Sequence, residues 1–165
     1  MSRGRSNKLT GAVGEFLVAA ELCRRNLIAT PFAGNVPHYD IIASDEDGRH
    51  LAVQVKTINR GNWQFTINKF VAVEQSGDVQ KLGQPLAEPY PNIRFVMVLL
   101  GSERQDDRFF ILTWEQLRDV VVDGYREYLN RHGGIRPRRP DSLHVSLTAD
   151  QIKAYEGKWE TLIST

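Results

Sequence analysis

Two short apolar segments joined by a turn constrain this fold more than any other feature of the sequence. Residues 39–42 and 51–56 read Tyr-Asp-Ile-Ile and Leu-Ala-Val-Gln-Val-Lys, and the segment between them contains Asp47-Gly48. An Asp-Gly pair between two apolar segments is a strong signal for a β-hairpin. We therefore expect two adjacent antiparallel strands that carry polar side chains at positions where a buried strand should have none.

The length of the turn decides which side chains of this hairpin meet. A three-residue loop, 46–48, with Gly48 in the left-handed conformation places Asp40 opposite Gln54. A two-residue loop would place Asp40 opposite Val55 and bury a carboxylate against an apolar side chain without a partner. The sequence therefore favours the three-residue loop.

Alternation along the strands then gathers polar groups on one face of the hairpin. Gln54 and Lys56 share a face, and in the three-residue register Asp40 lies on that face as well. His38 precedes Asp40 by two residues and is expected on the same face, opposite Lys56. The alternative is an exposed hairpin whose polar face is simply solvated.

A helix is predicted upstream of the hairpin. Segment 9–26 lacks proline, and its apolar residues recur at helical spacing. Glu15 lies away from the polar side of this helix, next to Val18 and Leu22. An inward-facing carboxylate costs free energy unless a charge or a metal compensates it. Alternatively, the end of Glu15 reaches solvent or pairs with Lys8.

Length and composition favour one globular domain over residues 1–165. The chain is 41% hydrophobic, which suffices for a substantial core. Residues 1–8 are polar and basic and are expected to form a disordered tail. The net charge of +1 gives no global basic field, which argues mildly against non-specific coating of DNA.

The single cysteine and the lack of long apolar segments limit the kinds of site and the class of protein that this chain can form. Cys23 falls on the apolar arc of the predicted helix and is expected in the core, and one cysteine cannot form a disulfide or a zinc-type pair within the chain. No signal peptide or membrane-spanning segment is evident, so we expect a cytoplasmic protein with no membrane partner.

The remainder of the chain alternates between strand and helix signals. Further strands are expected at 63–67, 94–100, 109–112 and 143–147. A capping box, Thr113 with Gln116, opens a helix that continues to Tyr128, and Thr148 with Gln151 opens a short second one. Segment 68–92 is rich in glycine and proline, which predicts irregular chain apart from a short strand at 71–73.

One dense basic segment, 131–140, follows the second helix. Its arginines lie on a Gly/Pro-rich loop and are not expected to pack. Arg136, Arg138 and Arg139 therefore either bind nucleic-acid phosphates or lie in solvent. His38 is a further candidate for a phosphate contact.

The polar residues of the hairpin and the helix suit a hard cation. Mg²⁺ prefers oxygen ligands and is often held by only one or two carboxylates. Glu15 and Asp40 supply the charge, and the amide oxygen of Gln54 can complete the set. A cation there would offset phosphate charge and lower the pKa of a bound water, while Lys56 would hold or deprotonate that water. This is the logic of phosphodiester hydrolysis.

The order of these residues resembles the PD-(D/E)XK nuclease superfamily. Glu15 lies in a helix, Asp40 in an apolar strand, and Gln54-x-Lys56 in the next strand. Gly14-Glu15 is similar to the helix opening of archaeal Holliday-junction resolvases and small restriction-endonuclease-like proteins. The resemblance covers residues 9–58 and implies an α/β fold with a restriction-endonuclease-like core, a mixed β-sheet flanked by helices.

The resemblance also implies roles for these residues. Asp40 and Gln54 would be ligands of Mg²⁺ or Mn²⁺, Glu15 a further ligand, and Lys56 the catalytic base or the residue that positions the water. The implied activity is a metal-dependent endonuclease that hydrolyses DNA in repair, recombination or restriction. Superfamily nucleases often act as dimers, so a homodimer is one expected arrangement. The residues themselves do not separate DNA from RNA.

Two positions depart from the family pattern and leave alternatives open. Tyr39 replaces the proline before the aspartate, and Gln54 replaces an acid, which removes one charge from the site. One alternative is an inactive nuclease-fold module that binds nucleic acid or a protein, although the retained Lys56 argues against decay. Another is a structural domain in which Glu15, Asp40 and Lys56 form an ion-pair network.

Overall fold

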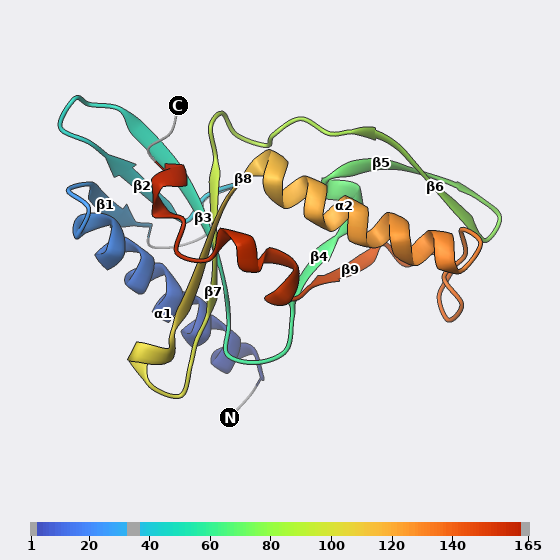
Figure 1. Ribbon diagram of the computed structural model, residues 1–165, viewed down its shortest axis with the longest axis horizontal. Helices are drawn as coiled ribbons and strands as arrows, with labels where there is room; N and C mark the ends of the chain where they lie inside the picture. Colours follow the sequence, from blue (N-terminus) through green and yellow to red (C-terminus); the bar gives the residue numbers. More distant parts are fainter. Residues whose placement is uncertain (1–2, 33–36, 163–165) are drawn as a thin grey trace.

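A five-stranded mixed β-sheet divides the molecule (Figure 1). The computed structural model describes residues 3–32 and 37–162. The strand order is β1-β2-β3-β7-β8, and only β3 and β7 are parallel neighbours. The strands are β1 (Ile28–Pro31), β2 (Ile41–Ser44), β3 (His50–Ile58), β7 (Arg94–Leu99) and β8 (Arg108–Thr113). The expected mixed sheet is confirmed, while β1 had no counterpart in the prediction.

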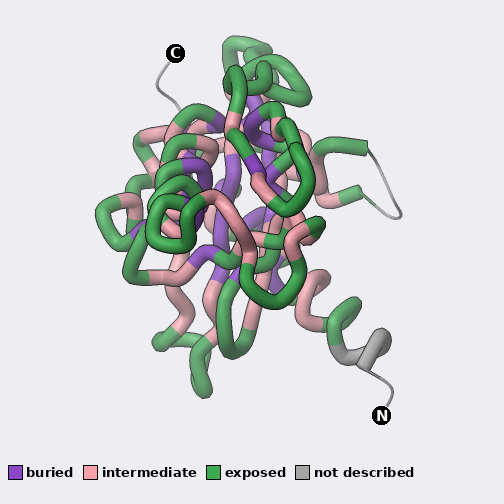
Figure 2. Tube along the Cα trace, turned by 90° about the vertical axis from the view of Figure 1, so that its right-hand side faces the viewer, coloured by how far each residue is buried: buried purple, intermediate pink, exposed green. Residues whose placement is uncertain are grey.

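The two long helices cover opposite faces of this sheet. Helix α1 (Arg3–Cys23) packs on one face and α2 (Trp114–Arg131) on the other (Figure 1). On β7, Val96 and Val98 join the core beneath α1, whereas Phe95 and Met97 join the core beneath α2. Figure 2 shows the buried residues concentrated in the central strands. The unbroken apolar run of β7 is thus explained by burial on both faces.

Helix α1 differs from its prediction in two respects. It begins at Arg3, so the expectation of a disordered tail over residues 1–8 was wrong for 3–8, which make the first turns of the helix, while residues 1–2 lie outside the described residues. Cys23 is exposed, and its predicted place in the core was wrong. The helix instead buries the face that carries Val18 and Leu22, both 0% exposed.

Two smaller sheets extend the side of the molecule that α2 covers. Strand β4 (Trp63–Thr66) pairs antiparallel with β9 (His144–Leu147), and β5 (Val71–Ser76) pairs with β6 (Val79–Pro85) in a hairpin that turns at Gly77. The short strand expected at 71–73 is confirmed as part of β5, and 86–92 is irregular as expected, but the prediction of irregular chain was wrong for 74–85, which continues β5 and forms β6.

A buried amide holds the β5–β6 hairpin in place. Gln80 is 3% exposed, accepts a 2.6 Å hydrogen bond from the Tyr125 hydroxyl, and donates a 3.2 Å bond to the Ser142 carbonyl. These bonds satisfy a polar group that would be costly to bury alone. Gln80 thereby joins the hairpin to α2 and to the chain after the basic segment.

The predicted helix caps are present. The Thr113 hydroxyl accepts from the Gln116 N–H at 3.2 Å, and the Gln116 side chain accepts from the Thr113 N–H at 2.9 Å. Thr148 and Gln151 make the corresponding bonds before a short 3₁₀ helix, Asp150–Tyr155. None of the helices in the described chain is long and apolar enough to cross a membrane.

Candidate active site

The β2–β3 hairpin has the register that its turn predicted. Ile41 pairs with Val53, which places Asp40 opposite Gln54. Gly48 has a φ of 77°, in the left-handed region that glycine tolerates best. The three-residue loop is therefore confirmed.

Asp40 lies just before β2 and is tied to β3 by two hydrogen bonds. Its backbone N–H donates to the Val53 carbonyl at 2.9 Å, and its Oδ2 accepts from the Val55 N–H at 2.7 Å. Burial raises the pKa of Asp40, while the Val55 N–H and the charge of Lys56 partly oppose that rise. The carboxylate is thus fixed beside the residue that separates Gln54 from Lys56.

Gln54 and Lys56 face a large cavity on the side of the sheet that α2 covers. Both side chains are half-buried and line, with His38, a cavity of about 590 Å³. Phe65, Phe70, Phe95 and Trp114 form the aromatic part of its wall. Lys56 also lines a second cavity of about 480 Å³.

Glu15 approaches Asp40 from α1. A Cβ placed on Gly14 would lie 1.8 Å from Thr57 Oγ1, so only glycine lets α1 pack this closely on β3. Burial and the negative charge of Asp40 both raise the pKa of Glu15. The alternative ion pair between Glu15 and Lys8 is not formed, since neither residue belongs to any ion pair in the described chain.

These side chains have the chemistry of a divalent cation site. Glu15, Asp40 and Gln54 offer oxygen donors, and burial raises the pKa of both carboxyl groups. No group of three or more His, Cys, Asp and Glu suited to a metal occurs among the described residues.

The alternative of a structural ion-pair network is not supported. Among residues 3–32 and 37–162, no ion pair joins Lys56 to either carboxylate. Lys56 still lowers the pKa of Asp40 through its charge, so the two groups are close without being in contact. A free lysine beside uncompensated carboxylates is more typical of a reactive site than of a structural one.

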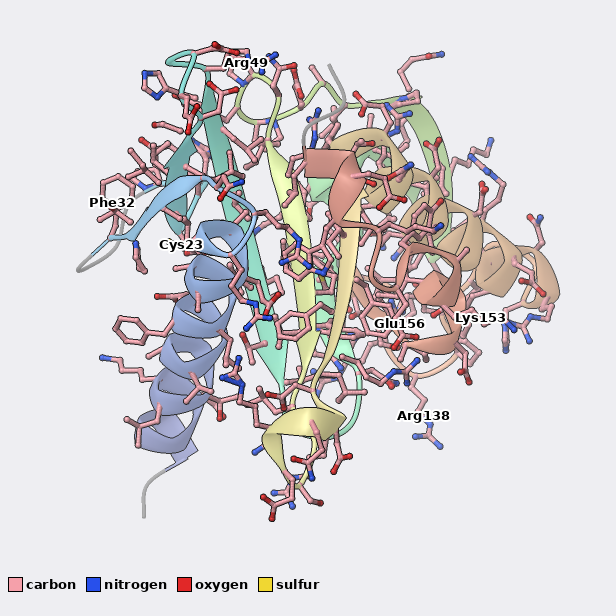
Figure 3. The ribbon with its side chains drawn as sticks, turned by 60° about the vertical axis from the view of Figure 1, so that its left-hand side comes forward. Cys23, Phe32, Arg49, Arg138, Lys153 and Glu156 are labelled. Carbon is pink, nitrogen blue, oxygen red and sulfur yellow. The ribbon has the colours of Figure 1, made fainter. Side chains whose placement is uncertain are left out.

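The basic segment divides into packed and exposed arginines. Arg136 donates to the Tyr125 hydroxyl at 3.3 Å and to the His144 carbonyl, and it lies 5.5 Å from the centre of the Tyr128 ring. The expectation that these arginines do not pack was wrong for Arg136. Arg138 and Arg139 are exposed, and Figure 3 shows Arg138 pointing away from the body of the molecule.

Sequence reasoning missed two residues that connect these features. Gln64, on β4, lines both cavities beside Lys56. His144, on β9, lines the larger of these cavities and a hollow of about 680 Å³ that Arg138 and Arg139 also line. The alternation in the two strands was visible in the sequence, but their pairing was not. His144 is thus shared by the cavity at Lys56 and the hollow at the exposed arginines.

Comparison with known proteins identifies the fold. No protein-family model matches the chain, and no curated protein matches it in sequence. The structure is similar to a bacterial homing endonuclease, I-Ssp6803I, with a TM-score of 0.50 and 14% sequence identity over 94% of this chain and 91% of that chain. The chain has a restriction-endonuclease-like fold. The similarity is one of fold, and it agrees with the fold class expected from the sequence.

A second solved structure is similar over nearly the same extent. It is Hjc, a Holliday junction resolvase from the hyperthermophilic archaeon Archaeoglobus fulgidus, with a TM-score of 0.47 and 11% identity over 87% of this chain and 88% of that chain. The roles assigned to Glu15, Asp40, Gln54 and Lys56 by the sequence motif remain predictions.

Proposed function

We propose that this protein is a metal-dependent endonuclease that hydrolyses DNA phosphodiester bonds in repair, recombination or restriction. The observation that carries the proposal is that the hairpin register places Asp40, Gln54 and Lys56 on one face. Glu15 lies close enough for the charge of Asp40 to raise its pKa. The fold shared with a homing endonuclease is consistent with this chemistry.

In this proposal Glu15, Asp40 and the amide oxygen of Gln54 hold Mg²⁺ or Mn²⁺. The cation would supply positive charge against the phosphate and activate a water molecule. The Val55 N–H keeps Asp40 oriented. Lys56 forms no ion pair with a described residue, so its ammonium group is free to position the water and to stabilise the negative charge that develops on the phosphate.

The substrate would follow the hollows that lead away from Lys56. His144 lines both the cavity at Lys56 and the hollow at the exposed Arg138 and Arg139. Cations spaced along a groove suit the regular phosphates of a nucleic acid. The homing endonuclease of similar fold makes DNA the first substrate class to test, with RNA as the comparison.

Cleavage assays with Mg²⁺ and Mn²⁺ test this function. The substrates are plasmid, linear, flapped, single-stranded and four-way-junction DNA, with RNA alongside. We expect Asp40→Ala and Lys56→Ala to lower the cleavage rate by about 10² to 10⁴, the usual contribution of a positioned acid or base. Lys153→Ala, at an exposed lysine of the 3₁₀ helix Asp150–Tyr155, is the matched control and should cleave normally.

The alternative of an inactive binding module makes a different prediction. Gln54→Glu restores the third acid, which should lower the Mg²⁺ concentration needed for cleavage by the active enzyme. If wild-type protein binds DNA but cleaves nothing with either metal, while Gln54→Glu does cleave, glutamine has inactivated the site. Cleavage retained in Lys56→Ala would contradict the proposed mechanism.

A further inference from the structure

The cavity of about 480 Å³ beside Lys56 is lined by cations and by hydrogen-bond donors. Its walls come from the first turns of α1 and from the chain between β3 and β4, and we call it the Arg60 cavity. Its side-chain amides belong to Asn7, Asn59, Asn62 and Gln64. Lys56 and Arg60 supply two positive charges, and none of the described residues that line the cavity is acidic. Such a lining attracts an anion.

The protein itself neutralises neither cation of the Arg60 cavity. Among residues 3–32 and 37–162, no ion pair includes Lys56 or Arg60. Another exposed arginine on a turn, Arg49, does pair with an acid, Asp45, at 2.6 Å. Two unpaired cations at one cavity repel each other, whereas a bound anion would interact favourably with both.

The loop that carries Arg60 is held at both ends. The indole N–H of Trp63 donates to the Lys56 carbonyl at 2.8 Å, and Trp63 is only 2% exposed. At the start of the loop, the Ile58 carbonyl accepts a 2.8 Å hydrogen bond from the Leu100 N–H, just after β7. The backbone at Arg60 is therefore positioned relative to Lys56 before any ligand binds, which reduces the entropy cost of binding.

The Arg60 cavity adjoins the cavity that Gln54 lines. Lys56 and Gln64 line both. Figure 1 shows the chain between β3 and β4 at the same end of the molecule as the first turns of α1. Every nucleotide of a nucleic acid carries one phosphate, so a strand with one phosphate at Lys56 has the next one only a nucleotide away.

We infer that the Arg60 cavity binds the backbone phosphate next to the scissile phosphate, on the DNA strand that is cut. The inference rests on the proposed function, because that function places the scissile phosphate at Lys56. Arg60 pairs with the phosphate oxygens, and the amides of the cavity donate further hydrogen bonds. A contact of this kind fixes the register of the strand and reads no base sequence.

The salt dependence of DNA binding, measured by fluorescence anisotropy with a chelator so that no DNA is cut, tests the inference. Loss of one phosphate contact lowers the slope of log K against log salt by about 0.9 on duplex DNA. We expect this loss in Arg60→Gln, and the wild-type slope in Arg60→Lys, which keeps the charge. Arg24→Gln is the matched control, because the Arg24 side chain is 74% exposed just after the C-terminal end of α1. It should keep the wild-type slope.

A wild-type slope in Arg60→Gln would overturn the inference. An equal loss in Arg24→Gln would also overturn it, because the effect would then reflect net charge and not a contact. The result is separate from cleavage. A protein that cuts no DNA but loses slope in Arg60→Gln keeps the phosphate site without the proposed function. A protein that cuts DNA while Arg60→Gln keeps the wild-type slope has the function without this site.

A second measurement locates the phosphate along the strand. A methylphosphonate linkage is uncharged, so we place a single one beside the mapped cleavage position. It should weaken binding to the wild type by about tenfold and leave binding to Arg60→Gln unchanged. A linkage that weakens binding to both proteins equally would overturn the assignment of that phosphate to Arg60.

Discussion

Asp40 Oδ2 accepts a 2.7 Å hydrogen bond from the backbone N–H of Val55. Asp40 immediately precedes β2, and Val55 lies on β3, the other strand of the hairpin. Since β2 begins only at Ile41, the side chain of Asp40 bonds to β3 just beyond the end of the β2–β3 pairing. It holds a carboxylate between two polar residues of β3 without neutralising it. The carboxylate is therefore partly buried and held in one orientation, and no ion pair in the described chain offsets its charge.

Asp40→Asn is expected to stabilise the metal-free protein at neutral pH. Burial raises the pKa of Asp40, so the folded state binds this proton more tightly than the unfolded chain. The stability linked to that proton is present below the ordinary carboxyl pKa and is lost as pH rises through the raised pKa. Asparagine keeps an oxygen for the Val55 N–H. We expect denaturant unfolding in the presence of a chelator to show that the free energy of unfolding of Asp40→Asn rises relative to that of the wild type from about pH 4 to about pH 8.

A second aspartate of the same hairpin provides the control with the opposite sign. The pKa of Asp45 is lowered, mainly by a hydrogen bond from the Arg49 N–H. Asp45→Asn should therefore reduce stability at neutral pH, and the loss should disappear at low pH.

Mg²⁺ should stabilise the wild type and not Asp40→Asn. A metal-free Asp40→Asn protein that is less stable than wild type at neutral pH would contradict the account of Asp40.

Gly14→Ala is expected to destabilise the protein by about 1–3 kcal/mol, the usual cost of overpacking. The added methyl carbon would lie 1.8 Å from Thr57 Oγ1, so α1 must shift away from β3 and carry Glu15 with it. Gly11→Ala is the matched control, because nothing lies within 4 Å of its Cβ position. Gly11→Ala should therefore show only the gain in helix propensity, a stabilisation of about 1 kcal/mol.

A double-mutant cycle isolates the contact between Gly14 and Thr57. Thr57→Ala removes the hydroxyl and methyl that the alanine at position 14 would meet, so it should recover part of the lost stability. Free energies of unfolding from denaturant titration measure all four proteins. Equal stabilities of Gly14→Ala and Gly11→Ala would show that the helix does not depend on this close approach.

The basic segment should separate into structural and binding arginines. Arg136→Ala is expected to cost about 1–2 kcal/mol of stability, because it removes hydrogen bonds to Tyr125 and His144. Arg138→Ala and Arg139→Ala should leave stability within about 0.5 kcal/mol. They should instead weaken DNA binding and reduce its dependence on salt. Filter binding at several salt concentrations measures this, and unchanged affinity in both variants would remove these arginines from the DNA path.

Local signals in the sequence were sufficient for the centre of the candidate site. The Asp-Gly turn determines the register of the hairpin, because a three-residue loop with Gly48 left-handed allows only one pairing. Alternation then places Gln54 and Lys56 on the face of Asp40. These relations hold between residues close in sequence, where turn geometry and strand periodicity leave few choices.

Partners far apart in sequence could not be predicted in the same way. The alternation of β4 and β9 marks both as strands, yet nothing in either identifies the other as its neighbour. The deep burial of Gln80 and the packing of Arg136 depend on that tertiary arrangement. Glycine and proline in segment 68–92 suggested irregular chain, whereas packing against α2 stabilises a hairpin there.

The sequence by itself determined that α1 is a helix, where the hairpin turns, and which polar side chains share a face. Only the tertiary structure decided which apolar side of α1 enters the core, because helical spacing makes Val18 and Cys23 equally suitable candidates. Gly14 permits close approach on the side of Val18, so that side packs on the sheet and Cys23 stays outside. Periodicity specifies faces, and long-range packing specifies what covers them.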